Sequence, residues 1–218
     1  MRVVVAEDHA LMRAGIVSVL ANGLIEVVAT AASLDDARDA IDQHEPDAVV
    51  TDIRMPPGHI DEGIRLAGEL RTSRPETGVV VLSQHVNAPY ALALLEGGSG
   101  RRAYLLKQRI TEEAALCEAV HTVVAGGSVI DKAVVEVLMA FERRGRTMLS
   151  FLTPRETEVL EEMATGASNG RIASRLGLSE RSVEKHSNAV FAKLGLSEEL
   201  DVNRRVKAVL LFLDEHKA

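Results

Sequence analysis

The sequence predicts a parallel α/β domain followed by an all-α domain, and two observations support this. Short apolar segments alternate with helical patterns throughout residues 1–125, which favours a doubly wound sheet covered by helices on both faces. No strand pattern occurs from Leu152 onward, after a polar, basic stretch at 142–150 that has the composition of a linker. We therefore expect an α/β domain at 1–126, a linker with a helical segment at 127–150 and an all-α domain at 151–218.

Five strands are expected in the first domain, each a short apolar run that ends at a polar residue. Runs of this kind are typical of strands buried on both faces of a parallel sheet. The strands are expected at Val3–Ala6, Glu26–Ala29, Ala48–Thr51, Val79–Leu82 and Ala103–Leu106. The helices are expected at Ala10–Ala21, Leu34–His44, Gly63–Ser73, Tyr90–Glu96 and Thr111–Ala125, with a further helical segment in the linker at Asp131–Phe141.

The all-α domain opens with a helix-start signal in the sequence LTPRETEVLEEMA, residues 152–164. Thr153 is expected as the N-cap and Pro154 as the first helical residue, and Glu156 is placed to complete a capping box. This helix is expected to bury its apolar stripe against the helices that follow.

The next segment has the spacing of a helix-turn-helix. Ala173, Gly177 and Val183 lie four and then six residues apart. In that motif a small residue lets two helices approach, a glycine permits the sharp turn, and a branched residue packs underneath. Ser179 is placed to cap the second helix of the unit, expected at Glu180–Leu194.

The composition is that of an ordinary soluble globular protein, with 46% hydrophobic and 26% charged residues. No apolar run is long enough to span a membrane, and the N-terminus lacks the features of a signal peptide. The single cysteine, Cys117, cannot form an internal disulfide, so we expect a cytoplasmic protein with Cys117 as a small buried residue. The net charge is −7 and neither half is strongly basic, so composition alone does not predict nucleic-acid binding.

Acidic residues follow two strands that are expected to be neighbours. Glu7 and Asp8 follow the first strand and Asp52 follows the third, at the switch point of a sheet with strand order 2-1-3-4-5. Three carboxylates repel one another unless they share a proton or a cation such as Mg²⁺. Ser83 and Lys107 follow the other two strands, so a phosphoryl group fits here with Asp52 as nucleophile. Each residue alone is explained as a solvated strand end, but the five together indicate a site.

On these five residues, residues 1–125 resemble a receiver domain of two-component signalling, with a CheY-like or flavodoxin-like fold. The resemblance implies that Asp52 accepts a phosphoryl group from a histidine kinase. It also implies that Asp8, Asp52 and the backbone carbonyl of Arg54 bind Mg²⁺, with Glu7 acting through water. Ser83 and Lys107 match the hydroxyl and the lysine of the family's phosphorylation site.

Three further features concern how such a receiver is coupled to its output. Tyr104 matches the aromatic residue that turns inward with the Ser83 hydroxyl after phosphorylation, although an ordinary edge-strand aromatic is the alternative. Gln108 stands where the family usually has proline or aspartate, and the glycine-rich segment Glu96–Tyr104 is about two residues longer than usual. These departures leave open a receiver that acts as a phosphorylation-independent dimerisation module.

Residues 151–213 resemble the LuxR-type DNA-binding domain, on the sequences LTPRE, SNGRIASRLGLSERSVEKH and KLGL. The stretch 165–213 has 8 Lys/Arg against 5 Asp/Glu, a mild excess that suits phosphate contacts. Polar residues on a helix are usually only solvated, but the helix-turn-helix spacing favours DNA contact. By position Lys185, Glu184 and Asn188 match the base-reading residues, and Arg181, Ser168 and Asn169 are weaker candidates for backbone contacts.

The expected helix Asp201–Leu213 has one apolar stripe, part of which must pack within the domain: Val202, Val206, Val209, Leu210 and Leu213. Leu211 and Phe212 extend beyond this stripe, so we expect the helix to support a homodimer on DNA. The two resemblances identify the chain as a NarL/FixJ-type response regulator that is not a metabolic enzyme. A Mg²⁺-dependent phosphatase or phosphotransferase would need a second acid two residues after Asp52, where Arg54 stands. It would also leave the helix-turn-helix unexplained.

Overall fold

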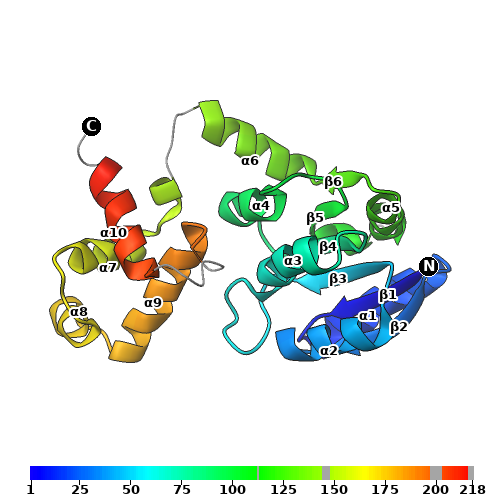
Figure 1. The fold of residues 1–218 in the computed structure, drawn as a ribbon, viewed down its shortest axis with the longest axis horizontal. Helices are drawn as coiled ribbons and strands as arrows, with labels where there is room; N and C mark the ends of the chain where they lie inside the picture. The colour runs from blue at the N-terminus through cyan, green and yellow to red at the C-terminus, as the bar shows by residue number, and fades with distance from the viewer. Residues whose placement is uncertain (112, 144–147, 197–202, 216–218) are drawn as a thin grey trace. The chain divides into compact units, whose positions relative to one another are not determined.

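The computed structural model describes residues 1–111, 113–143, 148–196 and 203–215, and the chain forms two compact units, Met1–Met139 and Ala140–Ala218 (Figure 1). Each unit has a hydrophobic core of its own. Within the described ranges, every helix is too short or too polar to cross a lipid bilayer.

The first unit is built on a parallel sheet whose strands follow the order β2-β1-β3-β4-β5-β6, which confirms the expected order of the first five strands. The strands are β1 Arg2–Ala6, β2 Glu26–Ala31, β3 Ala48–Asp52, β4 Gly78–Ser83, β5 Arg102–Leu106 and β6 Ser128–Ile130. The four central strands β1, β3, β4 and β5 are apolar and almost wholly buried, because helices cover both faces of the sheet.

The sixth strand corrects the expectation of five. β6 pairs with β5 in parallel, with Ser128 opposite Arg102 and Ile130 opposite Tyr104. It lies in the stretch 127–150 that was expected to be linker, so residues 128–130 belong to the sheet instead. Three residues are too few to give a readable pattern, and their strand conformation depends on pairing with β5.

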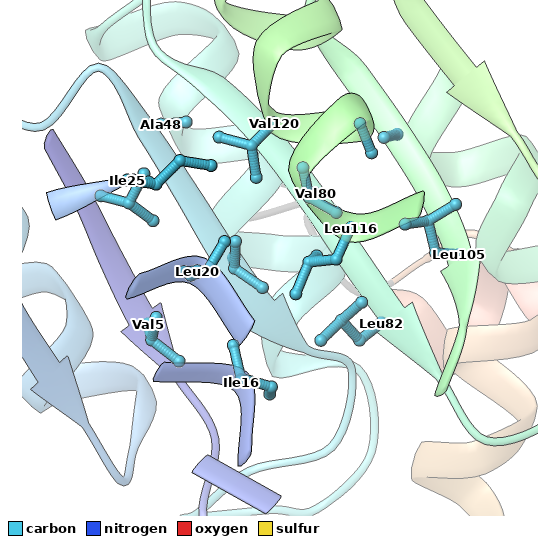
Figure 2. Packing of buried hydrophobic residues seen from close by; sticks show 14 of the residues in the cluster. Val5, Ile16, Leu20, Ile25, Ala48, Val80, Leu82, Leu105, Leu116 and Val120 are labelled. Carbon is cyan, nitrogen blue, oxygen red and sulfur yellow. The ribbon is translucent and has the colours of Figure 1, made fainter. Parts of the chain in front are cut away.

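Helices cover the sheet in two layers. α1 (Ala10–Asn22) and α5 (Glu113–Val124) pack together on one face, and α2 (Leu34–His44), α3 (Glu62–Ser73) and α4 (Ala88–Leu95) pack in series on the other. A short 3₁₀ helix, η1 (Lys107–Thr111), follows β5, and α6 (Lys132–Arg143) follows β6. Figure 2 shows the core under α1 and α5, where side chains from both helices meet side chains of the sheet.

The longer glycine-rich segment between α4 and β5 is held at its end by Arg101. This residue adopts a left-handed conformation with φ of 60°. Its guanidinium donates to the carbonyl of Val124, at the end of α5, over 2.6 Å and pairs with Glu76 at 2.5 Å. The segment is therefore tied to the end of α5 and to the loop between α3 and β4, at the end of the sheet opposite to the carboxylates.

The second unit contains η2 (Met148–Phe151), α7 (Pro154–Ala164), α8 (Asn169–Leu176), α9 (Glu180–Lys193) and α10 (Arg204–Glu215). The capping box of α7 is confirmed, because Thr153 N–H donates to Glu156 at 2.7 Å and Glu156 N–H donates to Thr153 at 3.3 Å. Gly177 ends α8 with φ of 64°, and Ser179 caps α9. The expected helix-turn-helix is therefore present.

Candidate functional sites

The register of the sheet brings the candidate residues of the first unit to one edge. Ala6 pairs with Thr51, so Glu7 and Asp8 emerge beside Asp52 at the end of β3. Ser83 pairs with Leu106, which places Lys107 directly after the same level of the sheet. Because the carboxyl ends of parallel strands meet at one edge of the sheet, the three carboxylates, the Ser83 hydroxyl and the Lys107 amine lie close together.

Lys107 bridges two of the carboxylates. Its Nζ lies 2.8 Å from Oε2 of Glu7 and 2.9 Å from Oδ2 of Asp52. These side chains are nearly enclosed, with exposed fractions of 15% for Lys107, 1% for Glu7 and 13% for Asp52. Asp8 is more open, and its Oδ2 lies 3.5 Å from Nδ1 of His59. The other oxygen of Asp52 accepts the Ile53 N–H at 2.8 Å, which orients the carboxylate.

Burial and pairing act in opposite directions on these groups. Burial raises the pKa of Glu7, and the negative charge of Asp52 adds to this, although the hydrogen bond from Lys107 lowers it in part. Burial alone would lower the pKa of Lys107, but its hydrogen bonds to Glu7 and Asp52 outweigh burial and raise the pKa. The ammonium thus stays charged and stabilises the carboxylates that flank it.

The donor set fits a hard divalent cation. One oxygen from each of Glu7, Asp8 and Asp52 lies within 4.8 Å of the others, and carboxylate oxygens are the ligands that Mg²⁺ prefers. Both oxygens of Glu7 already accept hydrogen bonds, Oε1 from the His9 N–H at 3.3 Å and Oε2 from Lys107. Asp52 is engaged in the same way, by the Ile53 N–H at one oxygen and Lys107 at the other, so a cation at this site would share both buried carboxylates with Lys107.

A cavity of about 140 Å³ lies beside the acids, lined among others by Asp52, Arg54 and Ser83. The Ser83 hydroxyl donates to the carbonyl of His85 over 2.7 Å, in the loop between β4 and α4. Asp52, Ser83 and Lys107 thus line the same cavity.

Tyr104 lies inward, with its side chain fully buried in the centre of β5. It is not an edge-strand aromatic, because β6 pairs with β5 and covers that edge. Burial raises the pKa of Tyr104 to about 12. Ser83 and the backbone of Asn87 lie near its hydroxyl and offset part of this rise, although no described residue forms a well-aligned hydrogen bond with it.

Three residues at this edge were missed by sequence reasoning. Glu62 is buried and accepts hydrogen bonds from the loop that follows β3. His59, in that loop, contacts Asp8, and the Tyr90 hydroxyl of α4 donates to the carbonyl of Ile60 over 2.8 Å. Their positions depend on how the loop after the Pro-Pro-Gly sequence folds, which spacing in the sequence does not reveal.

In the second unit, α9 presents a polar face beside a buried one. Val183 and Val190 are fully buried, whereas Arg181, Glu184 and Lys185 are exposed and Asn188 is half-buried. Among the described residues, no carboxylate forms an ion pair with Lys185 or Arg181. The expected base-reading residues therefore share the accessible side of α9.

The two candidates for backbone contacts lie at the start of α8. Ser168 is the N-cap, and its hydroxyl accepts the Arg171 N–H at 3.4 Å. The side-chain carbonyl of Asn169 accepts a hydrogen bond from Arg205 of α10 over 2.9 Å. Both residues thus have structural contacts at a helix N-terminus, a position that favours anions such as phosphate.

α10 has both a buried and an exposed apolar side. Ala208 is fully buried, and Phe212 packs on the core, which corrects the expectation that it extends beyond the packed stripe. Val206, Leu210 and Leu213 are exposed, as is Leu211. The first three are four and then three positions apart, so they form one stripe on the helix. Asp201 and Val202, which were expected to begin the helix, lie outside the described residues.

Comparison with known proteins agrees with this geometry. Residues 3–121 match the model of the response regulator receiver domain, and residues 150–209 match that of bacterial regulatory proteins of the luxR family. The oxygen regulatory protein NreC of Staphylococcus epidermidis strain ATCC 12228 is 32% identical over 206 residues, which are 90% of this chain and 92% of NreC. NreC of Staphylococcus carnosus is 33% identical over 205 residues, with the same coverage.

Solved structures give the same result. The response regulator ChrA of a heme-sensing two-component system is 30% identical, with a TM-score of 0.52 and coverage of 100% of this chain and 98% of ChrA. RcsB of Salmonella typhimurium, at 23% identity, has a TM-score of 0.57 and 98% coverage of both chains, which supports the fold alone. The matches extend over both units, and the chain therefore belongs to the NarL/FixJ family of two-component response regulators, transcription factors that join a receiver domain to a LuxR-type helix-turn-helix domain.

Proposed function

We propose that Mg²⁺-dependent phosphorylation of Asp52 by a sensor histidine kinase controls dimerisation and promoter binding by this response regulator. The observation that supports this most directly is the Lys107 bridge to Asp52 and Glu7, beside Asp8 and an open cavity. An aspartate in this setting is a nucleophile with a fixed cation beside it. The family's function in gene regulation gives such a site its role as a switch, in the cytoplasm where promoter DNA is found.

In the proposed step, one carboxylate oxygen of Asp52 attacks the phosphorus of a phosphohistidine. A P–O bond forms as the P–N bond breaks, and the imidazole nitrogen leaves with the electron pair and takes a proton from solvent. Lys107 stabilises the negative charge on the phosphoryl oxygens. Bound Mg²⁺ supplies charge neutralisation and orientation of the phosphoryl group. Asp8, Asp52 and the backbone carbonyl of Arg54 would hold it, with Glu7 acting through water.

Ser83 then passes the signal to α4. In the unphosphorylated structure the Ser83 hydroxyl donates to the His85 carbonyl at 2.7 Å. A phosphoryl group on Asp52 would be a charged acceptor that competes for the same hydrogen. Release of His85 changes the loop that leads to Asn87, the N-cap of α4. Tyr104, already inward, then lies beside the rearranged hydroxyl.

The output is a dimer on DNA. Lys185, Glu184 and Asn188 are proposed to read base edges from α9, with Arg181, Ser168 and Asn169 contacting the backbone. The exposed α10 stripe of Val206, Leu210 and Leu213 would pair two copies on a two-half-site element. RcsB, at 23% identity, has been solved both as a DNA complex and as two dimers bound to two parallel DNAs, which supports this arrangement.

The chemical test is an intact-mass measurement after incubation with Mg²⁺ and acetyl phosphate. We expect one phosphoryl adduct on the native chain and none on Asp52→Asn. Asp47→Asn is the matched control, because Asp47 is an exposed acid immediately before β3, whereas Asp52 ends that strand. This substitution should leave the adduct unchanged. An adduct on Asp52→Asn, or none on the native chain with either acetyl phosphate or a kinase donor, contradicts the proposal.

The DNA test separates the proposal from a phosphorylation-independent receiver. Inward Tyr104 is the observation that favours that second candidate, because the aromatic switch residue already occupies its inward position. Promoter affinity of Asp52→Asn that equals that of the phosphorylated native chain would support the second candidate. Lys185→Ala is expected to cost about 1–3 kcal/mol of binding free energy in either case, with loss of discrimination at one base pair.

A further inference from the structure

Glu62 is a buried carboxylate that the proposed phosphorylation chemistry does not use. It is the first residue of α3 and only 2% exposed. A carboxylate in such a place needs hydrogen-bond donors to offset the loss of water. Its donors are backbone N–H groups of the loop between β3 and α3: Ile60 at 2.8 Å, Gly58 at 3.0 Å and Met55 at 3.4 Å.

These bonds use three of the four backbone N–H groups in residues 55–60. Pro56 and Pro57 have no N–H, and the His59 N–H donates to the carbonyl of Met55 over 2.9 Å. The remaining N–H groups from residue 55 to residue 60 all go to Glu62. A Cβ added to Gly58 would lie 2.6 Å from Oε1 of Glu62, which shows how closely the loop wraps this carboxylate.

The Met55 N–H belongs to the same peptide group as the carbonyl of Arg54, the backbone ligand expected for Mg²⁺. In a trans peptide the N–H and the C=O point in opposite directions. A bond from the Met55 N–H to Glu62 therefore turns the Arg54 carbonyl away from Glu62. It also fixes the plane of the peptide, while Arg54 itself lines the cavity beside Asp52.

We propose that Glu62 is a positioning residue for the metal site: it holds the loop 55–60 by its backbone donors and so aims the Arg54 carbonyl at the cation. This inference rests on the proposed Mg²⁺-dependent function. Groups that orient the atoms coordinating a metal commonly change its affinity about ten-fold or more without contacting the metal themselves. Glu62 acts in this way through the peptide group between Arg54 and Met55.

The test compares Glu62→Gln with Glu69→Gln in the full chain, using Mg²⁺ alone as the probe. Both residues are glutamates of α3, but Glu69 pairs with Arg38 and does not contact the loop. An amide keeps the shape of Glu62 yet replaces one acceptor oxygen with a donor, which opposes at least one loop N–H. We expect Glu62→Gln to weaken Mg²⁺ binding about ten-fold or more by calorimetry, and Glu69→Gln to leave it unchanged.

Amide hydrogen exchange of Met55, Gly58 and Ile60, measured without cation, gives a second readout. Faster exchange at these amides in Glu62→Gln, together with weaker Mg²⁺ binding, supports the positioning role. Native Mg²⁺ affinity in Glu62→Gln overturns it, even where the variant is less stable, since a purely structural residue lowers stability and leaves affinity unchanged in the folded protein. If Glu62→Gln fails to fold, Glu62→Asp, with a shorter reach, replaces it under the same criteria.

A native chain that binds no Mg²⁺ at all overturns both the metal in the proposed function and this inference. A native chain that binds Mg²⁺ while Glu62→Gln binds it equally well overturns the inference alone. The two failures are therefore distinguished by the native titration.

Discussion

Replacing Lys107 by methionine is expected to destabilise the receiver domain strongly in the absence of divalent cations. The Lys107 Nζ lies 2.8 Å from Glu7 and 2.9 Å from Asp52, and none of the three side chains is more than 15% exposed. Removing one partner of a buried pair costs about 3–5 kcal/mol. We expect the lower end, about 3 kcal/mol, because the Asp52 side chain keeps 13% exposure, although Glu7 is enclosed. Burial raises the pKa of Glu7, so the stability lost in Lys107→Met should become smaller as the pH falls and the Glu7 carboxyl is protonated.

The assay is urea unfolding of the full chain followed by circular dichroism, with and without Mg²⁺. Lys132→Met is the matched control, because Lys132 lies 3.7 Å from Glu136 in a pair whose side chains are 87% and 66% exposed. An exposed pair of this kind is worth less than about 1 kcal/mol. Mg²⁺ should recover more stability in Lys107→Met than in the native chain, since the cation replaces the ammonium. Equal losses in the two variants, or an equal effect of Mg²⁺ on native and Lys107→Met chains, would refute the reasoning.

Three other predictions concern different parts of the chain. Gly63→Ala should lower the free energy of unfolding by about 3 kcal/mol in the same assay, because the new Cβ would lie 2.0 Å from the Asp52 carbonyl oxygen. The control Gly15→Ala, which has open space around its Cβ, should raise the free energy of unfolding by about 1 kcal/mol. Leu210→Gln should change stability by less than about 0.5 kcal/mol, yet weaken gel-shift binding to a two-half-site DNA more than to one half-site. Stability should fall above pH 10, because the folded chain holds the Tyr104 proton to about 12 while the unfolded chain loses it; Tyr104→Phe should remove this part of the fall, and an unchanged alkaline profile would contradict it.

The sheet could be predicted from the sequence because strands that are buried on both faces consist of continuous apolar residues. Val3–Ala6 and Val79–Leu82 are such runs, and their strands lie at the centre of the sheet. β6 could not be predicted, because Ser128–Ile130 is short and only partly buried. Its strand conformation comes from non-local pairing with β5, which leaves no periodic signal in the three residues themselves.

The charged cluster could also be predicted, because strand ends have fixed positions once the strand order is known. Glu7, Asp52 and Lys107 meet where the order 2-1-3-4-5 places them. Glu62 and His59 could not, because their roles depend on a loop with a left-handed residue: His59 has φ of 54°. The signal present for Glu62 is an acid followed by glycine at a helix start, since Gly63 is where α3 closes against the end of β3.

The structure combines a buried Tyr104 with a Ser83 hydroxyl that donates to the His85 carbonyl. Tyr104 is inward and its hydroxyl has no partner among the described residues, while the Ser83 hydroxyl is turned to the His85 carbonyl. The side chain is fully buried, so packing around β5 holds the ring in place while Ser83 donates to His85. The inward ring therefore does not require Ser83 to have left His85. In the proposed switch, the step that remains for phosphorylation to drive is the change of acceptor at Ser83, and the loop to Asn87 is the element that it would release first.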